Sequence, residues 1–381
     1  MKIPFNLPYL SGRERSYVLE SLKSRAHCGN REFSQKCIKL MKEKYKFGEV
    51  FLTTSCTTAM EMGALLANIN PGDEVILPSY TFSSTANAIV LRGAKPVFCE
   101  VEEDTMNIDV DQIERLITAK TKMIIPIDYA GIPCNIGRIM KIARENKLIV
   151  MLDAAQSLHS FIDGKSTGVT PDLVAYSFHE TKNISCGEGG ALVVNRPEWI
   201  ERAHFLQEKG TDRKFVLDGV KSKYHWVDVG SSFLLSDILA AMLLAQLEDA
   251  KKIEKRRSQI TKAYRKLFAP YEKLGFLKIP HPPDNVEINH HAFFVIFDTP
   301  ANRKKFIALL KKKDIYVYIG YVPLHSSPMG RKFGYKKSSL QLTEDLASRL
   351  VRMPFYADLK GVKLSYTLGE MKKVLDLIYG S

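Results

Sequence analysis

Short runs of apolar and β-branched residues return at intervals between residues 50 and 194. They lack the apolar/polar alternation of strands with one wet face, which is typical of strands covered on both sides in a parallel sheet. Most are separated by stretches of helical length and period, for example residues 57–68, 84–91 and 136–146. The pattern predicts a seven-stranded α/β layer, with strands at residues 50–54, 74–77, 96–101, 123–127, 148–152, 173–177 and 191–194.

The last of these runs follows a glycine-rich loop, Gly187 to Gly190, rather than a helical stretch. A parallel crossover needs a dozen or more residues, usually including a helix. We therefore expect the strand at residues 191–194 to run antiparallel to its neighbour in an otherwise parallel sheet.

The C-terminal part of the chain has a different pattern. A long apolar helix predicted at residues 234–247 leads into a charged run, residues 251–257, which we interpret as the solvated face of a connecting helix. A nucleic-acid-binding patch usually brings a reading element or interleaved aromatic residues, and neither is evident. We predict a large domain over residues 1–245 and a small α+β domain over residues 246–381, with strands at 291–297 and 315–319 and helices at 301–312, 343–352 and 368–378.

Composition narrows the possible functions only a little. The 381 residues are 45% hydrophobic and 25% charged, as in an ordinary folded protein. Lys and Arg outnumber Asp and Glu by 55 to 42, which fits anionic small substrates as well as nucleic acid. The N-terminus has no apolar leader, and apolar runs such as residues 238–245 are far shorter than the roughly 18 residues that span a bilayer. We expect a cytoplasmic protein that binds neither membrane nor nucleic acid.

The candidate metal ligands are few. The six cysteines include no CxxC pair, so we expect free thiols. His290 and His291 open a predicted strand and have no third ligand at metal spacing. We therefore expect no metal site.

Two candidate catalytic residues follow neighbouring predicted strands, at the edge of the sheet where α/β proteins bind ligands. Asp153 comes directly after the strand at residues 148–152, and Lys182 lies in the loop after residues 173–177. A buried aspartate needs a cationic partner. Burial also lowers the pKa of a lysine, which favours its use as a nucleophile.

Two more strand ends supply residues for a flat, phosphorylated ligand. Cys56 and Thr57 open a helix, where free N–H groups attract a phosphate, and Phe82 lies in a polar loop after residues 74–77. Each feature alone is ordinary, as a helix cap, a surface charge or a core phenylalanine. Together at one sheet edge these residues match what pyridoxal phosphate requires. It needs a lysine for covalent attachment, an aspartate for its ring nitrogen and an aromatic side chain that stacks on its ring.

The same stretches carry a resemblance to a known family. Residues 71–76, 153–156, 177–183 and 187–190 resemble the DegT/StrS-type sugar-nucleotide aminotransferases, which are aspartate-aminotransferase-like enzymes of fold type I. The resemblance covers essentially the whole chain. It implies a PLP-dependent transferase with a seven-stranded, mostly parallel sheet, a smaller α+β C-terminal domain, and pyridoxal 5′-phosphate as its cofactor.

The resemblance also implies roles for the residues around the cofactor ring. Lys182 would hold the cofactor covalently and shuttle the proton, and Asp153 would pair with the pyridine nitrogen. Gln156 would contact the ring hydroxyl, and Phe82 would lie against the ring face. Lys182 and Asp153 are therefore the expected catalytic pair.

For the phosphate, the resemblance implies binding by the backbone of Cys56 and Thr57 and by the hydroxyl of Ser177. Many members complete this site with an asparagine of the neighbouring subunit, two residues after a glycine. Here Ser232 stands at that position, after Gly230. The resemblance thus implies a homodimer with shared active sites.

Substrate contacts are less determined by the residues. Tyr321 and His325 resemble a segment that lines the family's substrate cleft, although His325 could equally lie in a turn with a satisfied side chain. Lys209 could meet a pyrophosphate or face solvent. Asp128 stands where many members have histidine, and would alter the charge of the pocket.

Within the family, residues 78–82, 179–183 and 230–237 are most similar to enzymes that aminate C4 of a dTDP-linked 4-keto-6-deoxyhexose. We expect L-glutamate as the amino donor, a product with the galacto configuration, and a destination in surface polysaccharide such as lipopolysaccharide O-antigen. Two alternatives stay open. One is C3 amination of a 3-keto sugar nucleotide, and the other is a non-catalytic regulatory or binding protein with the same fold.

Overall fold

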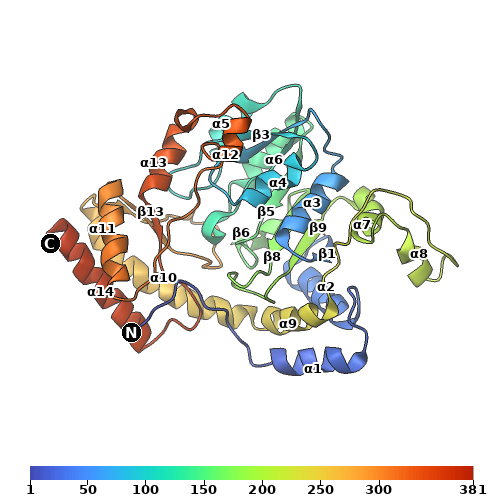
Figure 1. Cartoon of the computed structure of the whole chain (residues 1–381), viewed down its shortest axis with the longest axis horizontal. Coiled ribbons are helices and arrows are strands. Elements are labelled where there is room, and N and C mark those ends of the chain that lie inside the picture. Colours follow the sequence, from blue (N-terminus) through green and yellow to red (C-terminus); the bar gives the residue numbers. More distant parts are fainter. Residues whose placement is uncertain (381) are drawn as a thin grey trace.

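A seven-stranded sheet forms the centre of the computed structural model, which describes residues 1–380 (Figure 1). Its strand order is β1-β9-β8-β5-β4-β2-β3, and within the described residues only β9 runs antiparallel to its neighbours. All seven predicted strands are present, including the antiparallel one, which confirms the predicted fold. They are β1 (Glu49–Thr53), β2 (Glu74–Pro78), β3 (Lys95–Cys99), β4 (Thr121–Ile124), β5 (Ile149–Asp153), β8 (Leu173–Ser177) and β9 (Gly190–Val194).

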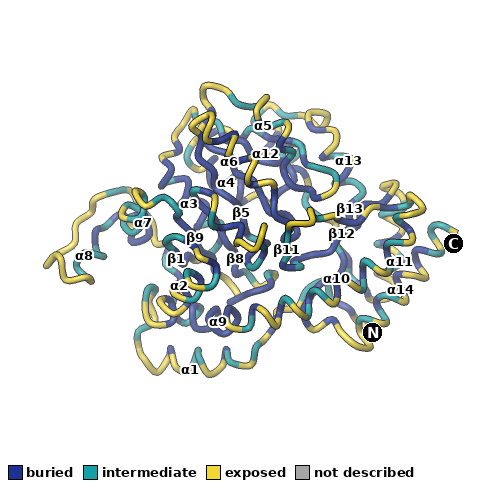
Figure 2. Tube along the Cα trace, turned by 180° about the vertical axis from the view of Figure 1, so that it is seen from behind, coloured by how far each residue is buried: buried dark blue, intermediate teal, exposed yellow. Residues whose placement is uncertain are grey.

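Helices cover both faces of this sheet. Successive residues of β8 face opposite ways, so Leu173 packs in one apolar core and Val174 in the other. Figure 2 shows the strands as the buried centre of the molecule. One core is closed by α2 (Glu32–Tyr45), α5 (Val110–Leu116), α6 (Ile136–Glu145) and α9 (Asp237–Glu248), and the other by α3 (Cys56–Leu66), α4 (Ser83–Val90) and α7 (Ile200–Gln207).

A long helix, α10 (Ala250–Lys273), links this layer to a C-terminal unit with its own core. Ala250 and Ile253 pack in the core of the large sheet, whereas Ile260 and Tyr264 pack in the C-terminal core. The unit is built from β10 (Leu277–Lys278), β12 (Phe294–Phe297), β13 (Leu350–Arg352), α11 (Pro300–Lys311), α12 (Pro328–Lys332), α13 (Gln341–Arg349) and α14 (Val362–Tyr379). Another small sheet of three strands contains β11 (Val286–Glu287), β6 (Phe161–Ile162) and β7 (Lys165–Ser166).

Several predictions for the C-terminal part are wrong in detail. The helix expected at residues 343–352 ends at Arg349, because residues 350–352 pair with β12 as strand β13. Residues 315–319 form no strand, only single bridges from Ile315 to Ile3 and from Tyr318 to Arg352. The charged run after α9 is not wholly solvated. Arg257 is buried and donates to the backbone carbonyls of His290 and His291.

The N-terminal segment joins both parts of the protein. Ile3 is buried in the C-terminal core, while α1 (Glu14–Ser24) lies along α9 (Figure 1). The first residues therefore pack with the small unit although they begin the predicted large domain. The boundary at residues 245/246 stays a prediction. No helix within residues 1–380 is long and apolar enough to cross a membrane.

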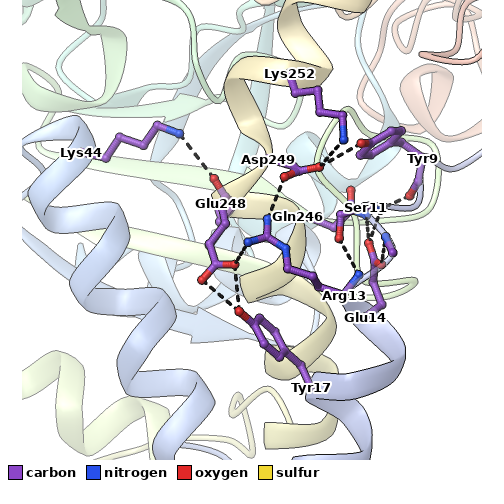
Figure 3. Close-up of polar contacts among 12 residues, drawn as sticks. Tyr9, Ser11, Arg13, Glu14, Tyr17, Lys44, Gln246, Glu248, Asp249 and Lys252 are labelled. Atoms are coloured by element: carbon purple, nitrogen blue, oxygen red, sulfur yellow. Dashed lines mark hydrogen bonds and ion pairs between the residues drawn. The ribbon is translucent and has the colours of Figure 1, made fainter.

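Polar contacts, some of them buried, fix the start of α1 against the junction of α9 and α10 (Figure 3). The Glu14 carboxylate accepts a hydrogen bond from Gln246 Nε2 at 2.5 Å. Arg13 pairs with Glu248 and with Asp249, each at 2.7 Å. Because α10 carries the C-terminal unit, these contacts hold the helix that positions one unit against the other.

Candidate active site

A pocket of about 380 Å³ lies at the carboxyl edge of the sheet, and residues of the C-terminal unit also line it. Most of the residues predicted from the sequence line this one pocket. They are Cys56, Thr57, Phe82, Asp153, Gln156, Ser177, Lys182 and Tyr321. The ends of β5 and β8 and the start of α3 therefore meet as the parallel topology requires.

Asp153 is the last residue of β5 and is almost fully buried. Thr85 Oγ1 donates to its Oδ2 at 2.8 Å, and the N–H of Ala155 donates to its Oδ1 at 3.1 Å. Burial raises the pKa of Asp153, while these two bonds and the charge of Lys182 partly oppose that rise. The carboxylate is thus fixed in place and suited to a cationic partner.

Lys182 lies in the turn after β8 and is half-buried. Its N–H donates to the carbonyl of His179 at 2.9 Å, which fixes the backbone of the turn. Desolvation lowers the pKa of Lys182, the nearby carboxylate of Asp153 raises it, and the charge of Arg352 lowers it. The net effect is a lowered pKa, which increases the fraction of the neutral, nucleophilic amine.

The start of α3 offers a cradle for an anion. Ser55 caps the helix by accepting from the N–H of Thr58, and the N–H groups of Cys56 and Thr57 have no partner within the described residues. The chain passes closely behind them at Gly190, where a Cβ would lie 2.5 Å from the backbone nitrogen of Cys56. Unpaired N–H groups at a helix N-terminus attract a phosphate.

Aromatic side chains form one side of the pocket. Gln156 Nε2 donates to the Tyr321 hydroxyl at 2.9 Å, and Gln156 Oε1 accepts from the N–H of Ala130 at 2.8 Å. Phe82 is 58% exposed and its ring centre lies 6.2 Å from that of Tyr321. Phe82 is therefore available to a ligand and does not belong to the core.

Other predicted residues lie elsewhere. His325 is fully buried, with Nδ1 2.7 Å from Ser79 Oγ, and does not line the pocket, so the structure favours its role in a turn. Lys209 and Ser232 line a separate pocket of about 290 Å³. Asp128 is buried and accepts bonds from the Cys134 N–H and the Ser157 hydroxyl. It does not line the active-site pocket itself, and its effect on the charge there stays a prediction.

The sequence analysis gave no role in the pocket to His291, Phe5 or Arg352, which all line it. His291 is buried, with its Nδ1 3.1 Å from the side-chain oxygen of Asn183. Burial, and after it the neighbouring positive charges, hold the pKa of His291 well below the usual range. Phe5 and Arg352 come from the two ends of the chain. Their ring and guanidinium lie 5.4 Å apart. No local pattern marks these residues, because the fold alone brings them to the pocket.

Residues 9–372 match the DegT/DnrJ/EryC1/StrS aminotransferase family. The chain belongs to this family. It is 36% identical over 329 residues to the uncharacterized protein MJ1066 of Methanocaldococcus jannaschii, which covers 84% of each chain. It is also 29% identical to the dTDP-4-dehydro-2,3,6-trideoxy-D-glucose 4-aminotransferase of Saccharopolyspora spinosa, with 86% of this chain and 85% of the relative covered.

The fold matches solved structures over nearly its full length. A putative sugar aminotransferase of Streptococcus pneumoniae, Spr1654 in its PLP form, superimposes with a TM-score of 0.90 at 23% identity, covering 99% of this chain and all of the other. The protein is a PLP-dependent sugar aminotransferase by its family. This confirms the predicted enzyme class and cofactor.

The residues of the pocket fit pyridoxal phosphate. A lysine with a lowered pKa and a buried carboxylate line the same cavity, as the cofactor's aldehyde and ring nitrogen require. The unpaired N–H groups of Cys56 and Thr57 provide donors for its phosphate. The pocket therefore has side chains suited to the ring and aldehyde of the cofactor, and backbone N–H groups suited to its phosphate.

Proposed function

We propose that this enzyme transfers the amino group of L-glutamate to C4 of a dTDP-linked 4-keto-6-deoxyhexose. The product would be dTDP-4-amino-4,6-dideoxyhexose with the galacto configuration, the reaction of a dTDP-4-amino-4,6-dideoxygalactose transaminase. The observation that carries the catalytic part is the shared pocket of Lys182 and Asp153. The substrate part is supported by the motifs at residues 78–82 and 230–237, and by the S. spinosa relative, whose name describes 4-amination of a dTDP sugar.

In this proposal Lys182 and Asp153 are the catalytic residues. Bound pyridoxal phosphate supplies an electron sink for the carbon that loses its proton. Lys182 Nζ would hold the cofactor covalently and would act as the base that takes the proton from the α-carbon of glutamate. Its lowered pKa favours the neutral amine that this step needs. Asp153, held by Thr85 and Ala155, keeps the pyridine nitrogen protonated.

The shared pocket supports the remaining cofactor contacts of this proposal. Cys56 and Thr57 would bind the phosphate through their N–H groups, and Ser177 through its hydroxyl at the end of β8. Gln156 would contact the ring hydroxyl, and Phe82 would cover the ring. Tyr321 would contact the sugar nucleotide beside Gln156.

We infer that the enzyme works as a homodimer with shared active sites. Ser232 lies outside the active-site pocket of its own chain, so it reaches a cofactor phosphate only in a second copy. Lys209, in the same separate pocket, would contact substrate there. The segment that follows α7 extends away from the body of the molecule (Figure 1). Its exposed large apolar side chains are Leu217, Val220, Tyr224, Trp226, Val227 and Val229. A partner subunit would cover this surface.

We place the reaction in the cytoplasm, where nucleoside triphosphates for sugar-nucleotide synthesis are available. We infer that the product enters a surface polysaccharide such as lipopolysaccharide O-antigen, because deoxyamino sugars are components of such polymers. Neither nucleic acid nor membrane has a part in this proposal.

Product analysis tests the proposal directly. The purified enzyme is incubated with L-glutamate and dTDP-4-keto-6-deoxyglucose, and with its 3-keto isomer in parallel, and the products are assigned by NMR. We expect an axial amine at C4 and one equivalent of 2-oxoglutarate. An amine at C3, an equatorial amine at C4, or no turnover of the dTDP sugar would each contradict the corresponding part of the proposal.

A further inference from the structure

Two asparagine side chains hold the ring of His291 in a single tautomer. Nδ2 of Asn183 donates to the backbone carbonyl of Asn289 at 2.8 Å, which fixes the orientation of the Asn183 amide. Its oxygen therefore faces Nδ1 of His291, at 3.1 Å. An amide oxygen only accepts hydrogen bonds, so Nδ1 must carry the hydrogen. Nε2 is then the ring nitrogen with a free lone pair.

The backbone of His291 is fixed as firmly as its ring. Arg257 donates to the carbonyls of His290 and His291 at 2.9 and 2.5 Å. The N–H of His291 donates to the side-chain oxygen of Asn289 at 3.0 Å. His290, between these contacts, has a φ of 53°, in the left-handed region that is uncommon for residues other than glycine. Such a conformation persists only where its surroundings impose it, which is typical of functional sites.

The free nitrogen of His291 lies close to the amine of Lys182. Both residues line the active-site pocket, and both line a smaller cavity that shares residues with it. Nε2 of His291 forms no hydrogen bond within residues 1–380, and it is not sealed in the interior. Nζ of Lys182 has no hydrogen-bond acceptor in the part of the chain that the structure describes. An unused lone pair and unused donors therefore share one small space.

We propose that Nε2 of His291 accepts a hydrogen bond from the amine of Lys182 when this amine is not bound to the cofactor. One N–H bond directed at His291 leaves the nitrogen lone pair free to face the substrate carbon. His291 is then a positioning residue for the proton transfer. The inference deepens the proposed function, because it rests on Lys182 as the base.

His291 suits this task because it accepts a hydrogen bond without taking the proton. Burial lowers the pKa of His291 well below its usual range, and the charges of Lys182, Arg352 and Arg257 add to this effect. The proton that Lys182 removes therefore stays on Lys182. Asp153 is the other acceptor of the pocket, but both its oxygens already accept hydrogen bonds from the surrounding protein.

The first test observes His291 directly in the full-length protein. Nitrogen NMR of labelled histidine reports which ring nitrogen carries the hydrogen, and the His291 signals are assigned by their loss in His291→Gln. The protein is measured without cofactor and loaded with pyridoxamine phosphate, two forms in which the Lys182 amine is free. Each form is compared with the same form of Lys182→Ala.

The second test removes the acceptor. His291→Leu lacks the lone pair, whereas the side-chain oxygen of His291→Gln can replace it. The control is His204→Leu, because His204 packs on Phe51 outside both cavities. Competitive acetylation at several pH values measures the pKa of Lys182 in the cofactor-free protein. Single turnovers of the holoenzyme with L-glutamate, with and without deuterium at the α-carbon, measure the proton transfer itself.

We expect Nδ1 of His291 to carry the hydrogen in both forms, and the Nε2 signal to move in Lys182→Ala. His291→Leu should lower the pKa of Lys182 by about 1, because the charged amine loses an acceptor. It should slow the single turnover about 10- to 100-fold and raise the isotope effect. The glutamate concentration that gives the half-maximal rate should change less than threefold. His291→Gln should recover part of the rate, and His204→Leu should match the wild type.

Three outcomes would overturn the inference. They are an Nε2 signal that does not respond to Lys182→Ala, a pKa of Lys182 that is equal in His291→Leu and the wild type, and a loss seen only in the affinity for one substrate. The last result would assign His291 to substrate binding. The proposed function fails separately if the wild-type enzyme does not aminate the dTDP sugar, and the NMR and acetylation measurements still test His291 in that case.

Discussion

The side-chain amide of Gln156 donates a hydrogen bond to the hydroxyl of Tyr321 at 2.9 Å, and both residues line the active-site pocket. Gln156 follows the central strand β5, whereas Tyr321 belongs to the C-terminal unit. The contact therefore joins the sheet edge that would hold the cofactor to the segment that would meet the sugar. In the proposed function this contact would link the position of the cofactor to substrate binding.

Tyr321→Phe removes the acceptor of this bond while keeping the ring. We expect KM for the sugar nucleotide to rise about 3- to 10-fold, as for one lost hydrogen bond, with a smaller change in kcat. Steady-state kinetics measure both, and Tyr366→Phe on α14, outside the pocket, serves as the control. An unchanged KM in Tyr321→Phe would show that the contact does not serve the substrate.

Thr85 positions the carboxylate of Asp153 through a buried hydrogen bond of 2.8 Å. Thr85→Val keeps the shape of the side chain but removes this donor. We expect kcat to fall about 10-fold, because Asp153 is then less well held and its charged form less favoured. Thr85→Ser restores a hydroxyl and should recover most of the activity. Equal kcat values for Val and Ser at this position would argue against a role for the bond.

Asp128 should make the stability of the protein depend on pH. Burial raises its pKa from 3.8 to about 6, against the opposing bonds from Cys134 and Ser157. Between about pH 4 and 6 the folded state therefore binds more protons than the unfolded state. The contribution of Asp128 to stability is present at low pH and is lost as the pH rises through this window.

Asp128→Asn removes this titration and can keep a bond to each partner. We expect the free energy of unfolding of the wild type to fall by about 2 kcal/mol more than that of the variant between pH 4 and 6. Urea denaturation at several pH values measures this difference. Parallel curves for the two proteins would contradict the raised pKa.

The central sheet and the cofactor residues were predictable because their signals are local. Each buried strand is a short apolar run. Asp153 ends such a run, and Cys56 and Lys182 follow other runs after a few loop residues. Parallel strands bring their carboxyl ends to one edge, so adjacency in space follows from order along the chain. The catalytic pair could thus be placed together without knowing any contact.

The C-terminal part was less predictable because its structure depends on distant partners. Residues 350–352 continue an amphipathic helix in sequence but pair as a strand with β12. Arg352 and Phe5 meet only because the N-terminal segment packs against the C-terminal unit at the pocket. His325 follows Tyr321 by four residues, yet it is buried against Ser79 and not in the pocket. The local sequence pattern therefore does not show which of these residues line the pocket and which lie outside it.

The most direct test of the account is the site of covalent cofactor attachment. The holoenzyme is reduced with borohydride and digested, and the peptides are analysed by mass spectrometry, with Lys182→Ala and the exposed Lys141→Ala in parallel. We predict that the pyridoxyl group is found on Lys182 in the wild type and in Lys141→Ala, and on no peptide of Lys182→Ala, which should also be inactive. A pyridoxyl group on another lysine, or a Lys182→Ala enzyme with near-normal activity, would contradict the account.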